Sequence, residues 1–174
     1  NILVAHVEAG LRSFDREMPE EINRVLTDQI SDYLFITSKE AEINLLNEGK
    51  NKEQIYLVGN TMIDSLLQFK NKFNCDILLK KYNVEKGNYC LITLHRPSNV
   101  DEESVLIKIV ETINDISNKF NCIWPMHPRT RKNIDKFSLF ISKNVHLLDP
   151  IGYFEFMGLQ KNANFIITDS GGIQ

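Results

Sequence analysis

Short runs of apolar residues alternate with amphipathic stretches along the whole chain. Seven runs have the length and composition of buried β-strands, and they cover residues 2–7, 33–37, 55–58, 89–94, 122–126, 145–148 and 165–168. The intervals repeat apolar positions with a helical period, most clearly in 101–120, and helices are also expected around Ile134 and Phe156. Strands that alternate with helices form parallel sheets covered on both faces, so the pattern predicts an α/β protein.

Two of the predicted helices have a recognisable first turn. Pro19-Glu20-Glu21 places a proline and two acidic residues where a helix begins, and an apolar stripe follows. Thr37-Ser38-Lys39-Glu40 has the pattern of a capping box, and Gly49 is suited to end the helix that it starts. Gly59-Asn60 predicts a turn before another apolar helix.

The pattern divides the chain into two parts. We predict one domain over residues 1–60 and a second over 61–174, with the crossover inside the polar, lysine-rich stretch 69–87. The first residues fall inside an expected strand, and the last fall where a helix is expected to begin. We therefore expect an internal stretch of a longer protein, in which both domains are incomplete.

Composition excludes several classes of function. The 174 residues are 43% hydrophobic and 25% charged, with a net charge of −3, which gives no electrostatic reason to expect nucleic acid or an anionic membrane as a partner. No apolar run approaches the roughly 20 residues that span a bilayer, and residues 1–6 lack the pattern of a signal peptide. Cys75, Cys90 and Cys122 are odd in number and widely spaced, which favours reduced thiols in the cytoplasm over disulfides or a zinc site.

Charged and glycine-rich segments follow several of the predicted strands. The strands are followed by Glu8-Ala-Gly-Leu-Arg12, His95-Arg96, His127 and Ser170-Gly171-Gly172, among others. Ligands of open parallel sheets bind beyond the carboxyl ends of the strands. A purely structural sheet would usually carry ordinary turn residues there, so this distribution indicates a binding site.

The segments after the strands suit a phosphate, although each has a simpler explanation. Ser170-Gly171-Gly172 could cradle a phosphate with backbone amides, or could be a tight turn that needs positive φ, and the motif alone does not separate the two. His95 and Arg96 suit a departing phosphate, but a loop histidine and a surface arginine would look the same. His127 has the same ambiguity with less support.

Of the acidic residues, Glu8 gives the strongest indication of a functional role, because a carboxylate at a strand end beside small residues has little structural purpose. Glu20 and Glu21 have a simple alternative role, the stabilisation of a helix dipole. Arg12 and Arg24 could hold a carboxylate ionised or bind phosphate. Two or three carboxylates around one pocket are the groups needed to move a carbon-bound proton.

Five motifs occur in an order that is specific to one enzyme family. They are His6-Val-Glu-Ala-Gly-Leu-Arg12, Pro19-Glu-Glu-Ile-Asn-Arg24, Gly59-Asn-Thr-Met-Ile-Asp64, His95-Arg-Pro-Ser-Asn-Val100 and Thr168-Asp-Ser-Gly-Gly-Ile-Gln174. Together they resemble the non-hydrolysing UDP-N-acetylglucosamine 2-epimerase family over nearly the whole chain. The resemblance implies two Rossmann-like parallel-sheet domains facing a cleft, a GT-B-like arrangement shared with a class of glycosyltransferases.

The resemblance also implies a reaction and its partners. The family interconverts UDP-N-acetylglucosamine (UDP-GlcNAc) and UDP-N-acetylmannosamine (UDP-ManNAc), by elimination of UDP to 2-acetamidoglucal and re-addition, and so supplies N-acetylmannosamine for cell-surface polysaccharide. No metal or redox cofactor is implied, and a homodimer is the family expectation.

Individual roles carry over by position. Glu8 and Glu20 match the catalytic carboxylates, and His95 matches the catalytic histidine near the departing UDP. The other matches are positions for the substrate or for a second UDP-GlcNAc that activates some bacterial members. The substrate positions are Arg12, Phe156 beside the uracil, and Ser170, Gly171 and Gly172 at the phosphates; the activator positions are Arg96 and His127.

The chain departs from the family in a few places. Ser98 stands where many relatives have glutamate. A further catalytic aspartate is expected upstream of Asn1, and further acidic residues and an arginine are expected after Gln174. The 174 residues alone are therefore expected to be inactive.

Three other functions remain open from the sequence. A hydrolysing relative would release UDP and free N-acetylmannosamine with many of the same site residues. A glycosyltransferase of the same architecture would need an acceptor and would not exchange the proton at sugar carbon 2. A non-catalytic nucleotide-sugar sensor would tolerate loss of Glu8 or Glu20 but would need the turn at Ser170.

Overall fold

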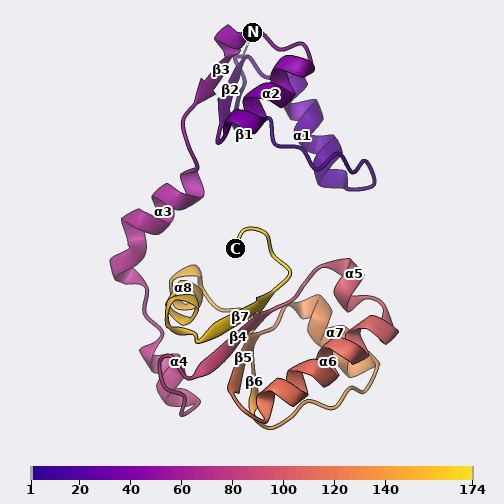
Figure 1. The fold of residues 1–174 in the computed structure, drawn as a ribbon, viewed down its shortest axis with the longest axis vertical. Coiled ribbons are helices and arrows are strands. Elements are labelled where there is room, and N and C mark those ends of the chain that lie inside the picture. Colours follow the sequence, from indigo (N-terminus) through magenta and orange to yellow (C-terminus); the bar gives the residue numbers. More distant parts are fainter. Residues whose placement is uncertain (1, 174) are drawn as a thin grey trace. The chain divides into compact units, whose positions relative to one another are not determined.

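The chain forms two compact units, Asn1–Gln68 and Phe69–Gln174, in a computed structural model that describes residues 2–173 (Figure 1). The units meet after Gln68, whereas the sequence pattern suggested a boundary after residue 60. The difference is helix α3 (Thr61–Phe69), most of which is grouped with the first unit. Each unit contains its own parallel sheet, which confirms the predicted α/β class.

The first unit, here unit 1, is built on a three-stranded parallel sheet of order β1-β2-β3. Its strands are β1 (Ala5–Ala9), β2 (Tyr33–Ile36) and β3 (Ile55–Leu57). Its helices before α3 are α1 (Pro19–Ile30), α2 (Lys39–Asn47) and the short 3-10 helix η1 (Lys52–Gln54). The first strand lies later than the predicted 2–7, because Ile2 and Leu3 are exposed and pair with no strand.

The core of unit 1 is small and joins α2 to the first two strands. The buried apolar residues are Ala9, Leu34, Ile36, Ala41 and Leu45. Ser38 is the N-cap of helix α2, and its hydroxyl accepts a hydrogen bond from the Ala41 N–H. The cap is therefore one residue later than Thr37, where the predicted capping box started.

The second unit, here unit 2, has a four-stranded parallel sheet of order β6-β5-β4-β7. Its strands are β4 (Tyr89–Thr93), β5 (Asn121–Pro125), β6 (Val145–Leu148) and β7 (Phe165–Thr168). Its helical segments are η2 (Lys70–Lys72), α4 (Asp76–Lys81), α5 (Pro97–Val100), α6 (Glu103–Ser117), α7 (Pro128–Lys136) and α8 (Tyr153–Asn162).

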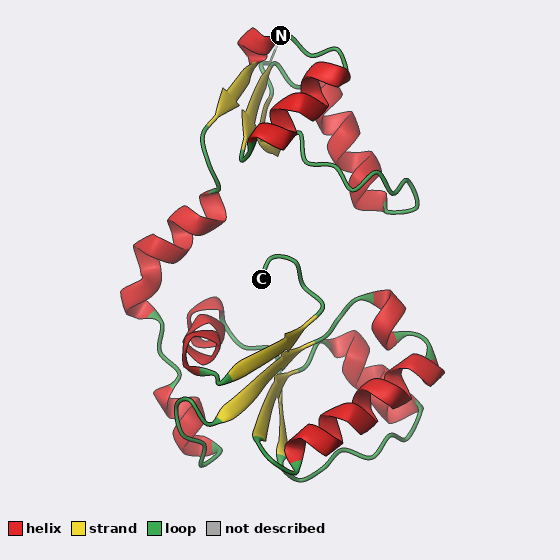
Figure 2. Cartoon of the chain, viewed as in Figure 1, coloured by secondary structure: helices red, strands yellow, loops and turns green. Residues whose placement is uncertain are grey.

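Helices cover both faces of this sheet, with α6 and α7 on one side and α4 and α8 on the other (Figure 2). Alternate residues of β4 serve the two layers: Cys90 and Ile92 pack with α6, whereas Tyr89 and Leu91 pack with α4 and α8. All of these side chains are fully buried. The Tyr89 hydroxyl is satisfied by a hydrogen bond to the Leu159 carbonyl at 2.6 Å. The continuous apolar run in the sequence thus reflects burial on two faces.

Gly158 lets helix α8 approach the start of α4 closely. A Cβ atom at this position would lie 2.7 Å from the Asn74 carbonyl carbon and 2.9 Å from the Cys75 nitrogen, which are backbone atoms that cannot rotate away. We expect Gly158→Ala to destabilise the protein by about 1–3 kcal/mol through overpacking, despite the better helix propensity of alanine. Urea denaturation of the intact protein measures this change.

Lys161→Ala is the matched control, because Lys161 is exposed on the same helix. It should change the free energy of unfolding by less than about 0.5 kcal/mol. Equal stability of the Gly158→Ala variant and the wild type would contradict the close approach of α8 to residues 74–75.

Candidate functional site

Glu8 occupies an unusual backbone conformation at the end of β1. The pairing register with β2 shifts between Val7 and Ala9, which makes Glu8 a β-bulge, and its φ is +74°. A residue with a Cβ atom adopts such a φ at a cost, and backbone strain of this kind concentrates at functional sites. The side chain is exposed, and within residues 2–173 its carboxylate takes part in no hydrogen bond or ion pair. The bulge therefore presents a free carboxylate at the carboxyl end of the strand.

Gly10 fixes the loop after Glu8 by close packing and two hydrogen bonds. Its φ is +77°, and a Cβ atom there would lie 2.5 Å from the Ala41 carbonyl oxygen of α2. The Gly10 N–H donates to Asp28 at 3.1 Å, and its carbonyl accepts from the Asn44 side chain at 3.0 Å. Both the conformation and the packing require glycine, so the position of Glu8 is set by a rigid neighbour.

Asp28 and Arg12 form a buried polar network beside this loop. Asp28 is fully buried and pairs with the His6 Nδ1 and with the Arg12 guanidinium, the latter at 2.7 Å. Arg12 also pairs with Glu48 through Nε and Nη2, and its Nη1 donates to the Leu11 carbonyl. The hydrogen bonds to Glu48 raise the pKa of Arg12, burial opposes this, and Asp28 adds to the rise.

Arg12, which is predicted to contact the substrate, is held by residues of unit 1. Its side chain is only 1% exposed, and each of its three nitrogens donates within unit 1. A guanidinium in this arrangement stabilises the fold of the loop. Arg12 also lines the cavity of unit 1 described below, and its contact with a UDP-sugar stays a prediction.

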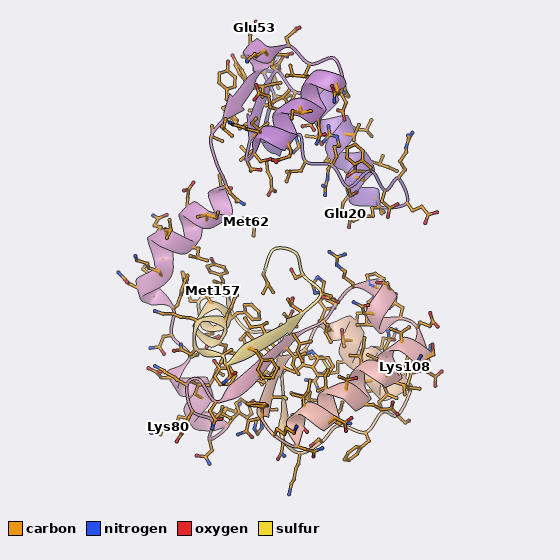
Figure 3. The ribbon with its side chains drawn as sticks, in the orientation of Figure 1. Glu20, Glu53, Met62, Lys80, Lys108 and Met157 are labelled. Atoms are coloured by element: carbon orange, nitrogen blue, oxygen red, sulfur yellow. The ribbon has the colours of Figure 1, made fainter. Side chains whose placement is uncertain are left out.

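The two neighbouring glutamates at the start of α1 have different surroundings. Glu21 is buried and accepts hydrogen bonds from the Ser13 and Phe14 N–H groups, both at 2.9 Å, and Arg24 lies 3.6 Å away. Burial raises the pKa of Glu21, but these hydrogen bonds and the Arg24 charge outweigh it, so the net pKa is lowered. Glu20 is exposed at the first turn of the helix (Figure 3). Of the two, Glu20 is the carboxylate available to a substrate.

Glutamine substitutions should separate these two roles. Glu21→Gln replaces one accepting oxygen with an NH₂ group that opposes a backbone N–H, so we expect a loss of stability of about 1.5–3 kcal/mol. Glu20→Gln should leave stability unchanged and reduce kcat by about 10²-fold or more, as expected for a general acid–base group. Urea denaturation and steady-state kinetics of the intact protein measure the two effects.

The pH dependence provides an internal control for Glu21. A carboxyl whose pKa is lowered on folding stabilises the protein above its unfolded pKa of about 4.3, and this contribution is lost as the pH falls through the lower folded value. The stability difference between wild type and Glu21→Gln should therefore shrink in acid. A difference that stays constant from neutral to strongly acidic pH would contradict the assigned role.

Unit 2 has a cavity of about 200 Å³ at the carboxyl ends of its strands. Its wall contains residues from the loops that follow β4, β5 and β6, together with Phe156 from the first turn of α8. Three residues predicted from sequence meet here, because His95, His127 and Phe156 all line the cavity. The two imidazole rings have their centroids 6.3 Å apart. The cavity thus combines two titratable groups with an aromatic wall.

His127 and Arg96 both lie at the start of a helix. The His127 Nδ1 accepts a hydrogen bond from the Arg129 N–H at 3.2 Å and caps α7, which leaves its Nε2–H free to donate. Arg96 precedes α5, and its side chain is exposed. Within residues 2–173 the Arg96 guanidinium forms no ion pair.

Asp169, which the sequence reasoning assigned no role, connects the ends of β7 and β4. Its carboxylate accepts hydrogen bonds from the backbone N–H groups of His95 and Arg96 and from the Asn99 side chain, at 2.8–3.2 Å. Burial raises the pKa of Asp169, but the hydrogen bonds from Arg96, Asn99 and His95 outweigh it, so the net pKa is lowered. The only signal in the sequence is the position of Asp169 directly after a strand.

Ser170, Gly171 and Gly172 come after β7 and Asp169, and the two glycines lie in a turn. The Ser170 N–H donates to the Thr168 hydroxyl at 3.0 Å, and the expected helix does not begin within the described residues. A Cβ atom on Gly171 would meet nothing within 4 Å, and its φ is not positive. Neither conformation nor packing in the described part of the chain requires glycine at this position.

A second cavity, of about 330 Å³, lies in unit 1 between the loop after Arg12 and helix α1. Its wall includes Phe14, Ile22 and Leu26, which are exposed, and the charged residues Arg16 and Glu21. Between residues 2 and 173, no group of three or more His, Cys, Asp or Glu side chains could hold a metal ion. No helix in that range is both long and apolar enough to cross a bilayer.

Comparison with known proteins gives consistent matches over the whole chain. A family model described as UDP-N-acetylglucosamine 2-epimerase matches residues 1–174. The UDP-N-acetylglucosamine 2-epimerase of Methanococcus maripaludis is 50% identical, over 99% of this chain and 50% of that protein. The UDP-2,3-diacetamido-2,3-dideoxy-D-glucuronate 2-epimerase of Pseudomonas aeruginosa is 42% identical, over 100% of this chain and 48% of that protein.

A solved structure is similar in fold as well as in sequence. The UDP-GlcNAc 2-epimerase of Methanocaldococcus jannaschii, in complex with UDP-GlcNAc and UDP, has a TM-score of 0.84 and 48% identity, covering 99% of this chain and 49% of that one. The chain spans about half the length of the curated relatives that it matches.

Proposed function

Because the chain belongs to the UDP-N-acetylglucosamine 2-epimerase family, we propose that the protein containing it interconverts UDP-GlcNAc and UDP-ManNAc without net hydrolysis. The reaction is an elimination followed by a re-addition. A base removes the proton at sugar carbon 2, the electron pair forms a double bond to carbon 1, and the bond from carbon 1 to the UDP oxygen breaks. Return of a proton to the opposite face of carbon 2, with re-addition of UDP, completes the epimerisation.

Unit 1 supplies the carboxylates for proton transfer. Glu8 and Glu20 are exposed, whereas Glu21 and Asp28 are committed to the fold. A base that removes a carbon-bound proton and an acid that returns one to the other face are two separate tasks, which two free carboxylates can divide. Elimination and re-addition are redox-neutral, so the proposed chemistry needs no redox cofactor.

Unit 2 supplies groups for the departing UDP. We assign to His95 the protonation or charge neutralisation of the leaving phosphate oxygen, and to Phe156 the wall for the uracil. We assign the phosphates to Ser170, Gly171 and Gly172, because this segment directly follows Asp169 after β7 and offers a hydroxyl and backbone N–H groups as donors. The observation that carries the proposal is the shared cavity of His95, His127 and Phe156 at the carboxyl ends of the strands.

Proton NMR in deuterated water tests this function on the intact protein. UDP-GlcNAc should give UDP-linked ManNAc, with deuterium at carbon 2 of both epimers at equilibrium. Release of free N-acetylmannosamine and UDP would instead identify a hydrolysing enzyme. Transfer of the sugar to an acceptor without exchange at carbon 2 would identify a glycosyltransferase, and binding without any turnover would identify a sensor.

The sugar preference needs its own arm of the same assay. The Pseudomonas relative is named for a diacetamido glucuronate sugar, which also carries an acetamido group at the epimerised carbon. UDP-2,3-diacetamido-2,3-dideoxy-D-glucuronate should therefore be compared with UDP-GlcNAc by kcat/KM. A higher kcat/KM for the glucuronate sugar would support the same epimerisation reaction with that sugar, and not UDP-GlcNAc, as the substrate.

We also propose a second, activating UDP-GlcNAc at Arg96 and His127. The exposed guanidinium and the free Nε2–H of His127 are suitable donors to a phosphate. Initial rates that rise sigmoidally with UDP-GlcNAc would support this site, and hyperbolic rates that stay hyperbolic in Arg96→Ala would argue against it. The protein is proposed to act as a homodimer, which light scattering tests.

The cellular role follows from the reaction. UDP-ManNAc made in this way would supply N-acetylmannosamine for cell-surface polysaccharide, and a cytoplasmic location agrees with three free, buried cysteines. Because the chain spans about half the length of its relatives, the isolated 174 residues are expected to show no turnover.

A further inference from the structure

The carboxylate of Asp169 contacts the His95 segment in two different ways. It accepts from the backbone N–H of His95 and of Arg96, which sets the path of the chain after β4. Its Oδ1 also lies 3.1 Å from the His95 Nδ1 on the side chain. The carboxylate is 6% exposed and the imidazole 44% exposed, so a buried anion faces one nitrogen of a ring that remains open to solvent.

The contact to the ring goes beyond what a fold-stabilising carboxylate requires. The backbone N–H groups and the Asn99 amide are enough to satisfy Asp169. The position of Nδ1 beside Oδ1 adds a preference for one protonation pattern of the ring. An ionised carboxylate only accepts hydrogen bonds, so a proton on Nδ1 is favoured over a lone pair there.

Within residues 2–173, the His95 Nδ1 forms no ion pair or hydrogen bond besides its contact with Asp169. His127 is the neighbouring titratable ring, and its Nδ1 is occupied by the Arg129 N–H. The Arg96 backbone is held by the same Asp169 oxygen that binds Asn99. With Nδ1 assigned to Asp169, the Nε2 of His95 is the nitrogen left for a ligand.

We propose that Asp169 is a positioning residue for His95, which orients the imidazole and selects the tautomer with the proton on Nδ1 and with Nε2 directed to the reacting group. This inference rests on the proposed epimerase function and deepens it. During elimination, Nε2 of the protonated ring gives its proton to the leaving phosphate oxygen, and the neutral ring keeps its proton on Nδ1 beside Asp169. During re-addition, Nε2 takes the proton back.

The first test reads the tautomer directly and needs no turnover. In the intact protein labelled with ¹⁵N-histidine, the His95 signals are identified by their loss in His95→Asn. Wild-type His95, when neutral, should show a protonated Nδ1 and an unprotonated Nε2. Asp169→Asn keeps the shape but places an NH₂ donor beside Nδ1, so the proton should move to Nε2. A wild-type ring with its proton on Nε2 would overturn the proposal, even if the variant does not fold.

The second test separates positioning from simple stabilisation. Asp169→Asn should reduce kcat by about 10²-fold or more, while KM and the binding of UDP change little. Asn99→Ala is the matched variant, because it removes one hydrogen bond to Asp169 without touching the His95 ring. It should retain the wild-type tautomer and lose far less activity than Asp169→Asn.

The outcomes distinguish failure of this inference from failure of the proposed function. If the wild-type protein does not epimerise UDP-GlcNAc but has the expected tautomer, the proposed function is wrong and the proposed Asp169–His95 arrangement is supported. If the wild-type protein epimerises UDP-GlcNAc and Asp169→Asn has the same kcat, the proposed function is supported and the positioning role of Asp169 is wrong. Equal losses of kcat and thermal stability in Asp169→Asn and Asn99→Ala would assign Asp169 to the fold alone.

Discussion

Replacing Glu8 with glutamine is expected to reduce kcat for epimerisation by about 10²–10⁴-fold, the range associated with loss of a general acid–base group. The change removes the charge and keeps the size of an exposed side chain that has no partner in the described residues. Stability should therefore not fall. Exchange of the carbon-2 proton with deuterated water measures the lost step directly.

Glu8→Gly extends this prediction, because glycine adopts a φ of +74° without strain. We expect this variant to be inactive and more stable than the wild type by up to about 1 kcal/mol, after the strain relief is offset by the extra freedom of the unfolded chain. Glu17→Gln, at an exposed position of the following loop, is the control and should affect neither property. An active Glu8→Gln variant would remove Glu8 from the mechanism.

Asp28→Ala is expected to have the largest effect on stability, a loss of about 3–5 kcal/mol. Asp28 is fully buried, and its removal leaves the His6 ring, the Gly10 N–H and one side of the Arg12 guanidinium without their acceptor. Urea denaturation measures the loss. At temperatures where the variant is still folded, kcat should also fall, since the loop that holds Glu8 loses an anchor.

Asp32→Ala is the matched control for this prediction. Asp32 is exposed, and within residues 2–173 its side chain accepts one hydrogen bond, from the Val4 N–H at 2.8 Å. Its loss should cost about 0.5–1.5 kcal/mol. If the two substitutions cost the same, the buried network does not hold the loop in the way described.

The sequence predicts unit 2 more closely than unit 1, for a physical reason. The run 165–168 matches β7, and 89–94 differs from β4 by one residue, because these strands are apolar on both faces and leave a continuous signal. In unit 1 the strand is interrupted by a charged bulge at Glu8, so the apolar run 2–7 only partly overlaps β1. Pattern alone does not show where pairing starts.

For the candidate site, the sequence predicts which residues lie in it but not the side chains that hold them. The sequence places His95 and His127 directly after strands and Phe156 in a helix, and the fold brings all three to one cavity at the edge where the parallel strands end. It does not show the partners of Arg12, since Glu48 is 36 residues away. The partner of His95 is still more distant, 74 residues along the chain, and its discovery required the sheet order that sets β7 beside β4.

The cysteines of this chain provide native reporters for one part of the molecule. All three lie in unit 2 and are buried, on β4, on β5 and at the start of α4, and residues 1–68 contain none. A thiol reagent can reach them only when that unit opens. The rate at which Cys90 or Cys122 is labelled would therefore measure the local opening of unit 2, separately from any unfolding around Glu8, and would need no engineered probe.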